Sequence, residues 1–86
     1  MLPTAPLKSN AELYVVTAAN TVSCLVCGLA MRHSGGNLAR SAHGRKHERR
    51  GEAVEVLSGP AWSTFTRYEF RLTASGAQLA NARLNL

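Results

Sequence analysis

The stretch that decides the fold begins at Cys24-Leu25-Val26-Cys27 and ends at His43-Gly44-Arg45-Lys46-His47. It presents two thiols at C-x2-C spacing, followed by two imidazoles at H-x3-H spacing. Two cysteines separated by two residues can direct both sulfurs to one site from a tight turn, and Gly28 provides the permissive backbone for such a turn. Histidines four residues apart lie one turn above each other on the same face of a helix.

Thiolate and neutral imidazole together suit Zn(II) in a closed tetrahedral site. We therefore expect one zinc ion per chain, bound by Cys24, Cys27, His43 and His47. Four protein ligands leave no open position for a substrate, so the pattern indicates a structural site. The chain has 86 residues and can bury only a modest fraction of its surface. Zinc binding, with roughly 10–16 kcal/mol of apparent binding energy in finger peptides, would stabilise such a domain.

Residues 24–47 resemble a Cys2His2 zinc finger. The run Gly44-Arg45-Lys46-His47 is similar to the end of the matrin-type and double-stranded-RNA-binding fingers, whose helix closes with an H-x-x-G-K-K-H-like pattern. Leu38 stands where that family places its core leucine. The resemblance implies a ββα-like unit over residues 24–50 that binds nucleic acid or another protein.

The chain departs from the family in its third ligand. The family's first histidine would fall at Ser41, so His43 must take that role. The result is C-x2-C-x15-H-x3-H, three residues longer in the middle than the usual x12. His33 is an alternative ligand that could replace either His43 or His47.

The cysteine pair has other interpretations. A thioredoxin-like redox pair needs a βαβ context that this short chain does not offer. A structural disulfide would suit a secreted protein, but residues 1–6 lack a charged region followed by an apolar run, and the loop closed would be too small to stabilise much. Buried free cysteines beside surface histidines remain an alternative. The cysteine usage favours a reducing, cytoplasmic location.

The net charge of +5 is concentrated in residues 40–50, which contain five cations and one acid, Glu48. The cations are Arg40, Arg45, Lys46, Arg49 and Arg50. A basic stripe on a finger helix attracts phosphate backbones, because each neutralised phosphate releases counterions. The same stripe could instead contact an acidic protein surface or only water.

The chain divides into a loose leader at residues 1–10 and a single small domain at residues 11–86. Hydrophobic residues make up 45% of the sequence, which indicates a folded chain, and no apolar run approaches the ~20 residues that cross a bilayer. Residues 12–17 are rich in β-formers and predict a first strand. Residues 22–29 predict a strand and knuckle, and residues 32–37 predict a flexible loop.

A helix is expected from Asn37, as its cap, to about Arg50, with Gly51 as a stop signal. On an uninterrupted helix, Leu38 would lie nearly opposite the face that carries the two histidines. Gly44 lies between the histidines and is placed to bend or end the helix there.

The remainder predicts a strand and a C-terminal helix, the extension at residues 61–86. Residues 53–57 either extend the first helix or form a short strand, and residues 58–60 break the pattern. Large and polar residues alternate from Trp62 to Leu72, as in a half-buried strand. Thr73 can cap a helix that runs through Leu84. The fold class is therefore α+β: a small single domain with a ββα-like unit held together by zinc, then a strand and a helix.

Two hypotheses about function follow. The first is a zinc-binding protein that binds DNA or RNA through the basic helix, Arg40 to Arg50. The second is a small zinc-stabilised inhibitor or adaptor that binds a host nucleic-acid-processing complex, as anti-CRISPR proteins of phages and mobile elements do. Its interface would include Tyr14 and the strand from Trp62 to Phe70. The sequence contains no aspartate, nucleophile elbow or P-loop, so we expect no enzyme, no small-molecule substrate and no membrane partner.

Overall fold

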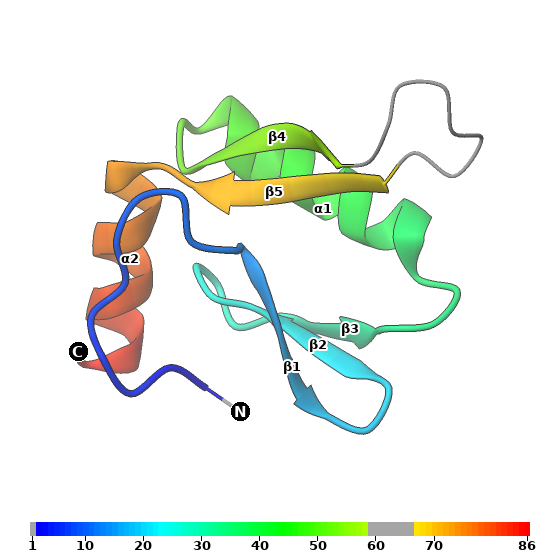
Figure 1. The fold of residues 1–86 in the computed structure, drawn as a ribbon, viewed down its shortest axis with the longest axis horizontal. Helices are drawn as coiled ribbons and strands as arrows, with labels where there is room; N and C mark the ends of the chain where they lie inside the picture. The colour runs from blue at the N-terminus through cyan, green and yellow to red at the C-terminus, as the bar shows by residue number, and fades with distance from the viewer. Residues whose placement is uncertain (1, 59–66) are drawn as a thin grey trace.

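The computed structural model describes residues 2–58 and 67–86, which form two antiparallel sheets and two helices (Figure 1). In chain order the elements are β1 (Tyr14–Ala18), β2 (Thr21–Cys24), β3 (Ala30–Arg32), α1 (Asn37–Arg49), β4 (Ala53–Ser58), β5 (Arg67–Leu72) and α2 (Ala74–Leu84). One sheet has the order β1-β2-β3, and the other pairs β4 with β5. The expected α+β class is confirmed.

The first sheet forms around the β-rich run that predicted its first strand. Val15 pairs with Ser23, and Val22 pairs with Met31. The turn between β1 and β2 contains Asn20 at φ 56°, a left-handed conformation that asparagine tolerates better than most residues. β3 was not predicted, because its three residues carry no strand pattern and are extended through their pairing with β2.

The segment before β1 joins the two sheets. Leu13 donates its backbone N–H to the carbonyl of Phe70 (3.0 Å), and Leu72 donates to the carbonyl of Ala11 (2.7 Å). Glu12 and Arg71 form an antiparallel bridge between these bonds. The leading segment therefore extends the β4–β5 pair before the chain turns into the first sheet.

The N-terminal segment also contacts α2. The backbone N–H of Leu7 donates to Asn81 Oδ1 (2.7 Å), and Asn81 Nδ2 donates to the Leu7 carbonyl (3.0 Å). The side chain of Leu7 packs against the core. This segment runs along α2 in Figure 1, so the N-terminal segment and the C-terminal helix lie side by side.

Helix α1 is continuous between the two histidines, which corrects the expectation of a bend or stop at Gly44. Gly44 instead allows a close approach to β5: a Cβ there would lie 2.5 Å from the ring of Phe70. The helix ends at Arg49, and Gly51, at φ 77°, follows as the predicted stop signal. At the other end the N-cap is Gly36, and the expected cap Asn37 is the first helical residue. Leu38 is 88% exposed, so the expectation of a core leucine was wrong. On an unbroken helix its face points away from the domain.

Residues 53–57, for which the sequence left helix and strand open, belong to a strand, because β4 pairs with β5 from Ala53↔Leu72 onward. The predicted alternation of buried and exposed residues is confirmed in β5, where Phe70 and Leu72 are buried. Residues 59–66, which include Trp62, lie outside the described residues. Thr73 caps α2 as predicted, with its side chain accepting from Gly76 N–H (3.1 Å).

The core draws on both sheets and on α2. Its buried cluster consists of Leu13, Cys24, Leu25, Ala53, Phe70, Leu72 and Ala80. Cys24 is fully buried within this cluster, so the first half of the C-x2-C knuckle is part of the core. Neither helix within residues 2–58 and 67–86 has the length and apolarity needed to cross a bilayer.

Candidate metal centre

The structure brings Cys24, Cys27, His43 and His47 to one place. One ligand atom from each lies within 4.8 Å of all the others. Cys24 Sγ is 3.4 Å from His47 Nε2, and Cys27 Sγ is 3.3 Å from His43 Nε2. The two Nε2 atoms are 3.0 Å apart. These four residues could therefore hold one metal ion.

The separations fit a tetrahedral zinc site. Zn–S bonds of about 2.3 Å and Zn–N bonds of about 2.0–2.1 Å at tetrahedral angles place sulfur and nitrogen about 3.6 Å apart and two nitrogens about 3.3 Å apart. The three separations above agree with these values to within about 0.3 Å. Two thiols and two imidazoles are also the donor set that suits zinc better than Mg²⁺ or Ca²⁺.

The cysteines are placed by a tight turn after β2. Cys24 N–H donates to the Leu29 carbonyl (2.9 Å), and Gly28 N–H donates to the Cys24 carbonyl (2.8 Å). Gly28 adopts φ 79°, which favours glycine. Leu25 N–H donates to the Leu13 carbonyl (2.8 Å) and so fixes the turn to the segment before β1. The knuckle Cys24–Gly28 is therefore held by backbone hydrogen bonds at both of its ends.

The histidines project from one face of α1, with ring centroids 4.7 Å apart. Tyr14 in β1 packs near His43, with ring centroids 6.1 Å apart, and its hydroxyl donates to the Arg40 carbonyl (2.7 Å). Tyr14 also meets Phe70 edge to face. It thus supports the helix and His43 from the first sheet.

Glu52 is a site residue that the sequence analysis did not identify. Its Oε2 atom lies 2.5 Å from His47 Nδ1, and the His47 side chain is only 3% exposed. A carboxylate there accepts a hydrogen bond from Nδ1–H and leaves the Nε2 lone pair facing Cys24. Metal-bound imidazoles usually donate their other ring N–H to a carboxylate, a carbonyl or a water in this way. A glutamate five residues after a histidine is common in sequences, so its spacing carried no signal.

Burial divides the site into an inner and an outer half. Cys24 and His47 are buried, His43 is half-buried, and Cys27 is exposed. Burial raises the pKa of the Cys24 thiol to about 11. Burial also lowers the pKa of His43, and the nearby His47, Lys46 and Arg50 lower it further. His43 is therefore held in the neutral form that a metal ligand requires.

The alternative interpretations of these residues receive less support. His33 does not belong to the four-residue group, and its backbone instead pairs with Asn20. Cys24 and Cys27 are free thiols. Cys24 is the last residue of β2, a strand of an antiparallel sheet, unlike the βαβ context of a thioredoxin-like motif.

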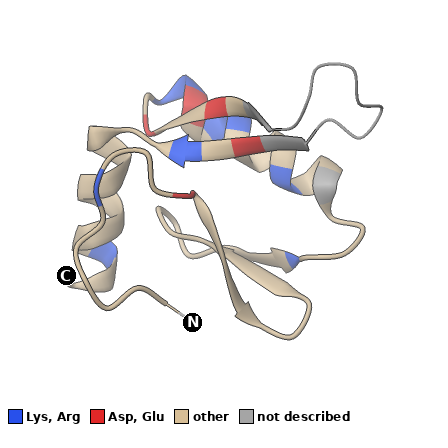
Figure 2. Cartoon of the chain, viewed as in Figure 1, with Lys and Arg blue, Asp and Glu red and all other residues tan. Residues whose placement is uncertain are grey.

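The basic residues of α1 fall into two groups. Arg40 faces the domain: its Nη1 donates to the carbonyls of Arg32 (2.7 Å) and His33 (2.6 Å). The exposed cations are Arg45, Lys46, Arg49 and Arg50. We call these four residues the outer basic face; the Lys and Arg positions along α1 are blue in Figure 2. Arg45 Nη2 lies 4.0 Å from Glu55 Oε1, with the arginine exposed and the glutamate partly buried.

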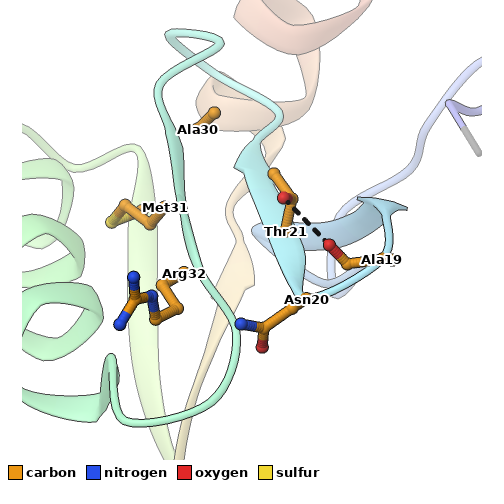
Figure 3. A pocket seen from close by; sticks show the side chains of 6 residues that line it. All are labelled: Ala19, Asn20, Thr21, Ala30, Met31 and Arg32. Atoms are coloured by element: carbon orange, nitrogen blue, oxygen red, sulfur yellow. Dashed lines mark hydrogen bonds between the residues drawn. The ribbon is translucent and has the colours of Figure 1, made fainter.

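A shallow hollow lies apart from the metal centre, at the β1–β2 turn and β3 (Figure 3). It is lined by Ala19, Asn20, Thr21, Ala30, Met31 and Arg32. Thr21 already donates its hydroxyl to the Ala19 carbonyl (3.3 Å). Arg32 is the one charged residue in this lining, so the hollow contains no acid–base pair.

Comparisons with protein-family models, with curated proteins and with solved structures found no match to this chain. The resemblance to a zinc finger therefore depends on the residues of the metal centre and on their geometry alone.

Proposed function

We propose that Cys24, Cys27, His43 and His47 bind one structural zinc ion. The observation that carries this is the convergence of four suitable donors at tetrahedral separations, with Glu52 behind His47. Zinc would link Cys24, at the end of β2, to the two histidines of α1. Four protein ligands leave no position for a substrate, so the ion supports the fold and catalyses no reaction.

Zinc content by native mass spectrometry tests this proposal. The untagged protein should carry one zinc per chain, and Cys27→Ser and His47→Ala should both lose it. His33→Ala is the matched control, because His33 lies outside the four-residue group, and it should keep its zinc. A wild-type protein without zinc, purified with zinc present throughout, would refute the proposal.

We further propose that the domain binds nucleic acid through the outer basic face. These four cations lie on or just after α1, and among the residues described, Glu48 is the acid that shares the helix. The Glu48 carboxylate accepts from the Glu55 backbone N–H (3.1 Å), so it is directed toward β4. Phosphate contacts by exposed arginine and lysine give affinity without reading base sequence. The proposal thus specifies duplex DNA or RNA, bound through its backbone.

The salt dependence of binding measures the number of contacts. On duplex DNA, log K should fall with log salt by roughly 0.9 per neutralised phosphate, hence by about 3–4 for four cations. Lys46→Glu should weaken binding and lower this slope by about one. Lys8→Glu is the matched control, because it makes the same change of charge on the segment preceding β1. Equal loss in both variants would mean that only net charge matters and would refute a specific face.

The inhibitor or adaptor hypothesis receives less support from this fold. It assigned interface roles to Tyr14 and Phe70, but Phe70 is 4% exposed and Tyr14 packs against His43. Trp62 lies outside the described residues. One observation still favours a protein partner: Leu38, at 88% exposed, offers an apolar anchor on the outside of α1. Double replacement Arg45→Glu/Lys46→Glu separates the two, since it should abolish duplex binding only if the nucleic-acid proposal holds.

A further inference from the structure

Helix α2 contacts the metal centre at both of its ends. At its start, Thr73 N–H donates to the Glu52 carbonyl (3.2 Å), and the Thr73 hydroxyl donates to the Gly51 carbonyl (2.6 Å). The first turn of the helix packs closely against the same backbone, because a Cβ at Gly76 would lie 1.8 Å from the Glu52 carbonyl oxygen. The first turn of α2 therefore holds Glu52, the residue that orients His47.

The other end of α2 holds the cysteines through Arg83. Its Nε donates to the Leu25 carbonyl (2.9 Å), and its Nη2 lies 3.5 Å from the Cys24 carbonyl. Nη1 lies against Gly28, where an added Cβ would approach it to 2.9 Å. One guanidinium thus contacts the first two residues of the knuckle and the glycine that closes it.

We propose that Arg83 is a positioning residue for the metal centre. Its planar fork spans two consecutive carbonyls, which fixes the direction of the chain between Cys24 and Cys27. Leu25 is 1% exposed, so its carbonyl would lose its hydrogen bond in a protected environment if Arg83 were removed. A lysine cannot reproduce this arrangement, because an ammonium group is a point charge without a fork.

The role of α2 follows from these two sets of contacts. The knuckle carries the two cysteines, and α1, which Glu52 follows in the sequence, carries the two histidines. A single rigid helix that contacts the knuckle and Glu52 keeps the two halves of the donor set at a fixed separation. The zinc-finger resemblance ends at His47, so α2 adds a support that the resembling unit does not itself contain.

The test compares metal release and metal geometry in variants. This inference rests on the proposed zinc binding, so the wild type is loaded first and its zinc is counted. Arg83→Gln should transfer zinc to an excess of chelator at least ten times faster than the wild type, in line with the 10–100-fold effects of outer-shell residues. Arg83→Lys should behave like Arg83→Gln. With Co(II) in place of zinc, the visible spectrum of Arg83→Gln should also change, because the sulfur ligands shift.

Leu84→Ala separates a positioning role from a merely structural one. Leu84 is the next residue of α2 and packs against the core, so its truncation weakens helix docking but leaves the hydrogen bonds from Arg83 to the knuckle in place. We expect less than a threefold change in zinc release and an unchanged Co(II) spectrum. If Arg83→Gln and Leu84→Ala release zinc equally fast with wild-type spectra, Arg83 serves only to hold α2. Loss of zinc from the wild type itself would instead refute the metal proposal and this inference with it.

Gly28→Ala provides a second, independent measurement. In the wild-type background it adds both backbone strain at φ 79° and a contact with Arg83. In an Arg83→Ala background only the strain remains. The effect of Gly28→Ala on zinc release should therefore be smaller when Arg83 is absent, and an equal effect in both backgrounds would overturn the assigned contact.

Discussion

Replacing Gly44 by alanine should destabilise this domain, although the same change at most helical glycines stabilises. Alanine improves helix propensity by about 1 kcal/mol. Against this gain, the new Cβ would lie 2.5 Å from two ring carbons of Phe70 and 2.7 Å from a third. Favourable carbon contacts lie at about 3.5–4.0 Å. Either the ring or the helix must therefore move by roughly 1 Å.

The cost of that movement exceeds the gain in propensity. Phe70 is 4% exposed and sits in the core, so its ring cannot swing into solvent. Overpacking of this kind typically costs 1–3 kcal/mol, and this contact lies at the severe end. We expect a net loss of about 1–2 kcal/mol, which corresponds to a fall in Tm of about 4–16 °C for a domain of this size.

Thermal unfolding of the zinc-loaded protein, followed by circular dichroism, measures this effect. Ala42→Gly is the matched control, because Ala42 is exposed on the same helix, and it should report the propensity difference alone. Adding Phe70→Leu to Gly44→Ala should recover part of the loss, since the smaller side chain makes room. A Gly44→Ala protein as stable as the wild type, or more stable, would refute the close-approach argument.

Three further predictions concern the metal centre. Glu52→Gln removes the charge behind His47 and should weaken zinc affinity by roughly 10–100-fold, measured by competition with a chromophoric chelator. Removal of zinc with a chelator should unfold the domain cooperatively, visible as loss of far-ultraviolet circular dichroism, and zinc alone should restore the signal. Because burial lowers the pKa of His43, the stability that depends on its neutral form should be complete above a pH of about 6.5 and decline as the pH falls through the lowered pKa. Native mass spectrometry from pH 7.5 to 4.5 should show zinc loss over the pH range in which His43 becomes protonated. Zinc loss already at pH 7 would contradict this prediction.

The sequence analysis was most accurate where chemistry is local. The β-rich run before Asn20, the cap at Thr73 and the stop at Gly51 were all predicted, because each depends on a few neighbouring residues. The four candidate ligands could be named for the same reason. The prediction for Leu38 was wrong because it came from a family position, whereas the direction of its side chain is set by which face of α1 meets the β4–β5 sheet.

The sequence by itself determined which donors are present and how each pair is arranged: two sulfurs on one turn, and two imidazoles on one helical face. Only the tertiary structure decided that both pairs meet, that Glu52 stands behind His47, and that Arg83 contacts the knuckle from the far end of the chain. It also decided that Gly44 is a site of close packing and not a bend. The physical reason is the distance along the chain over which residue spacing can fix geometry. Spacing along the chain governs geometry within one turn or strand, whereas contacts between distant segments depend on how helices and sheets pack together.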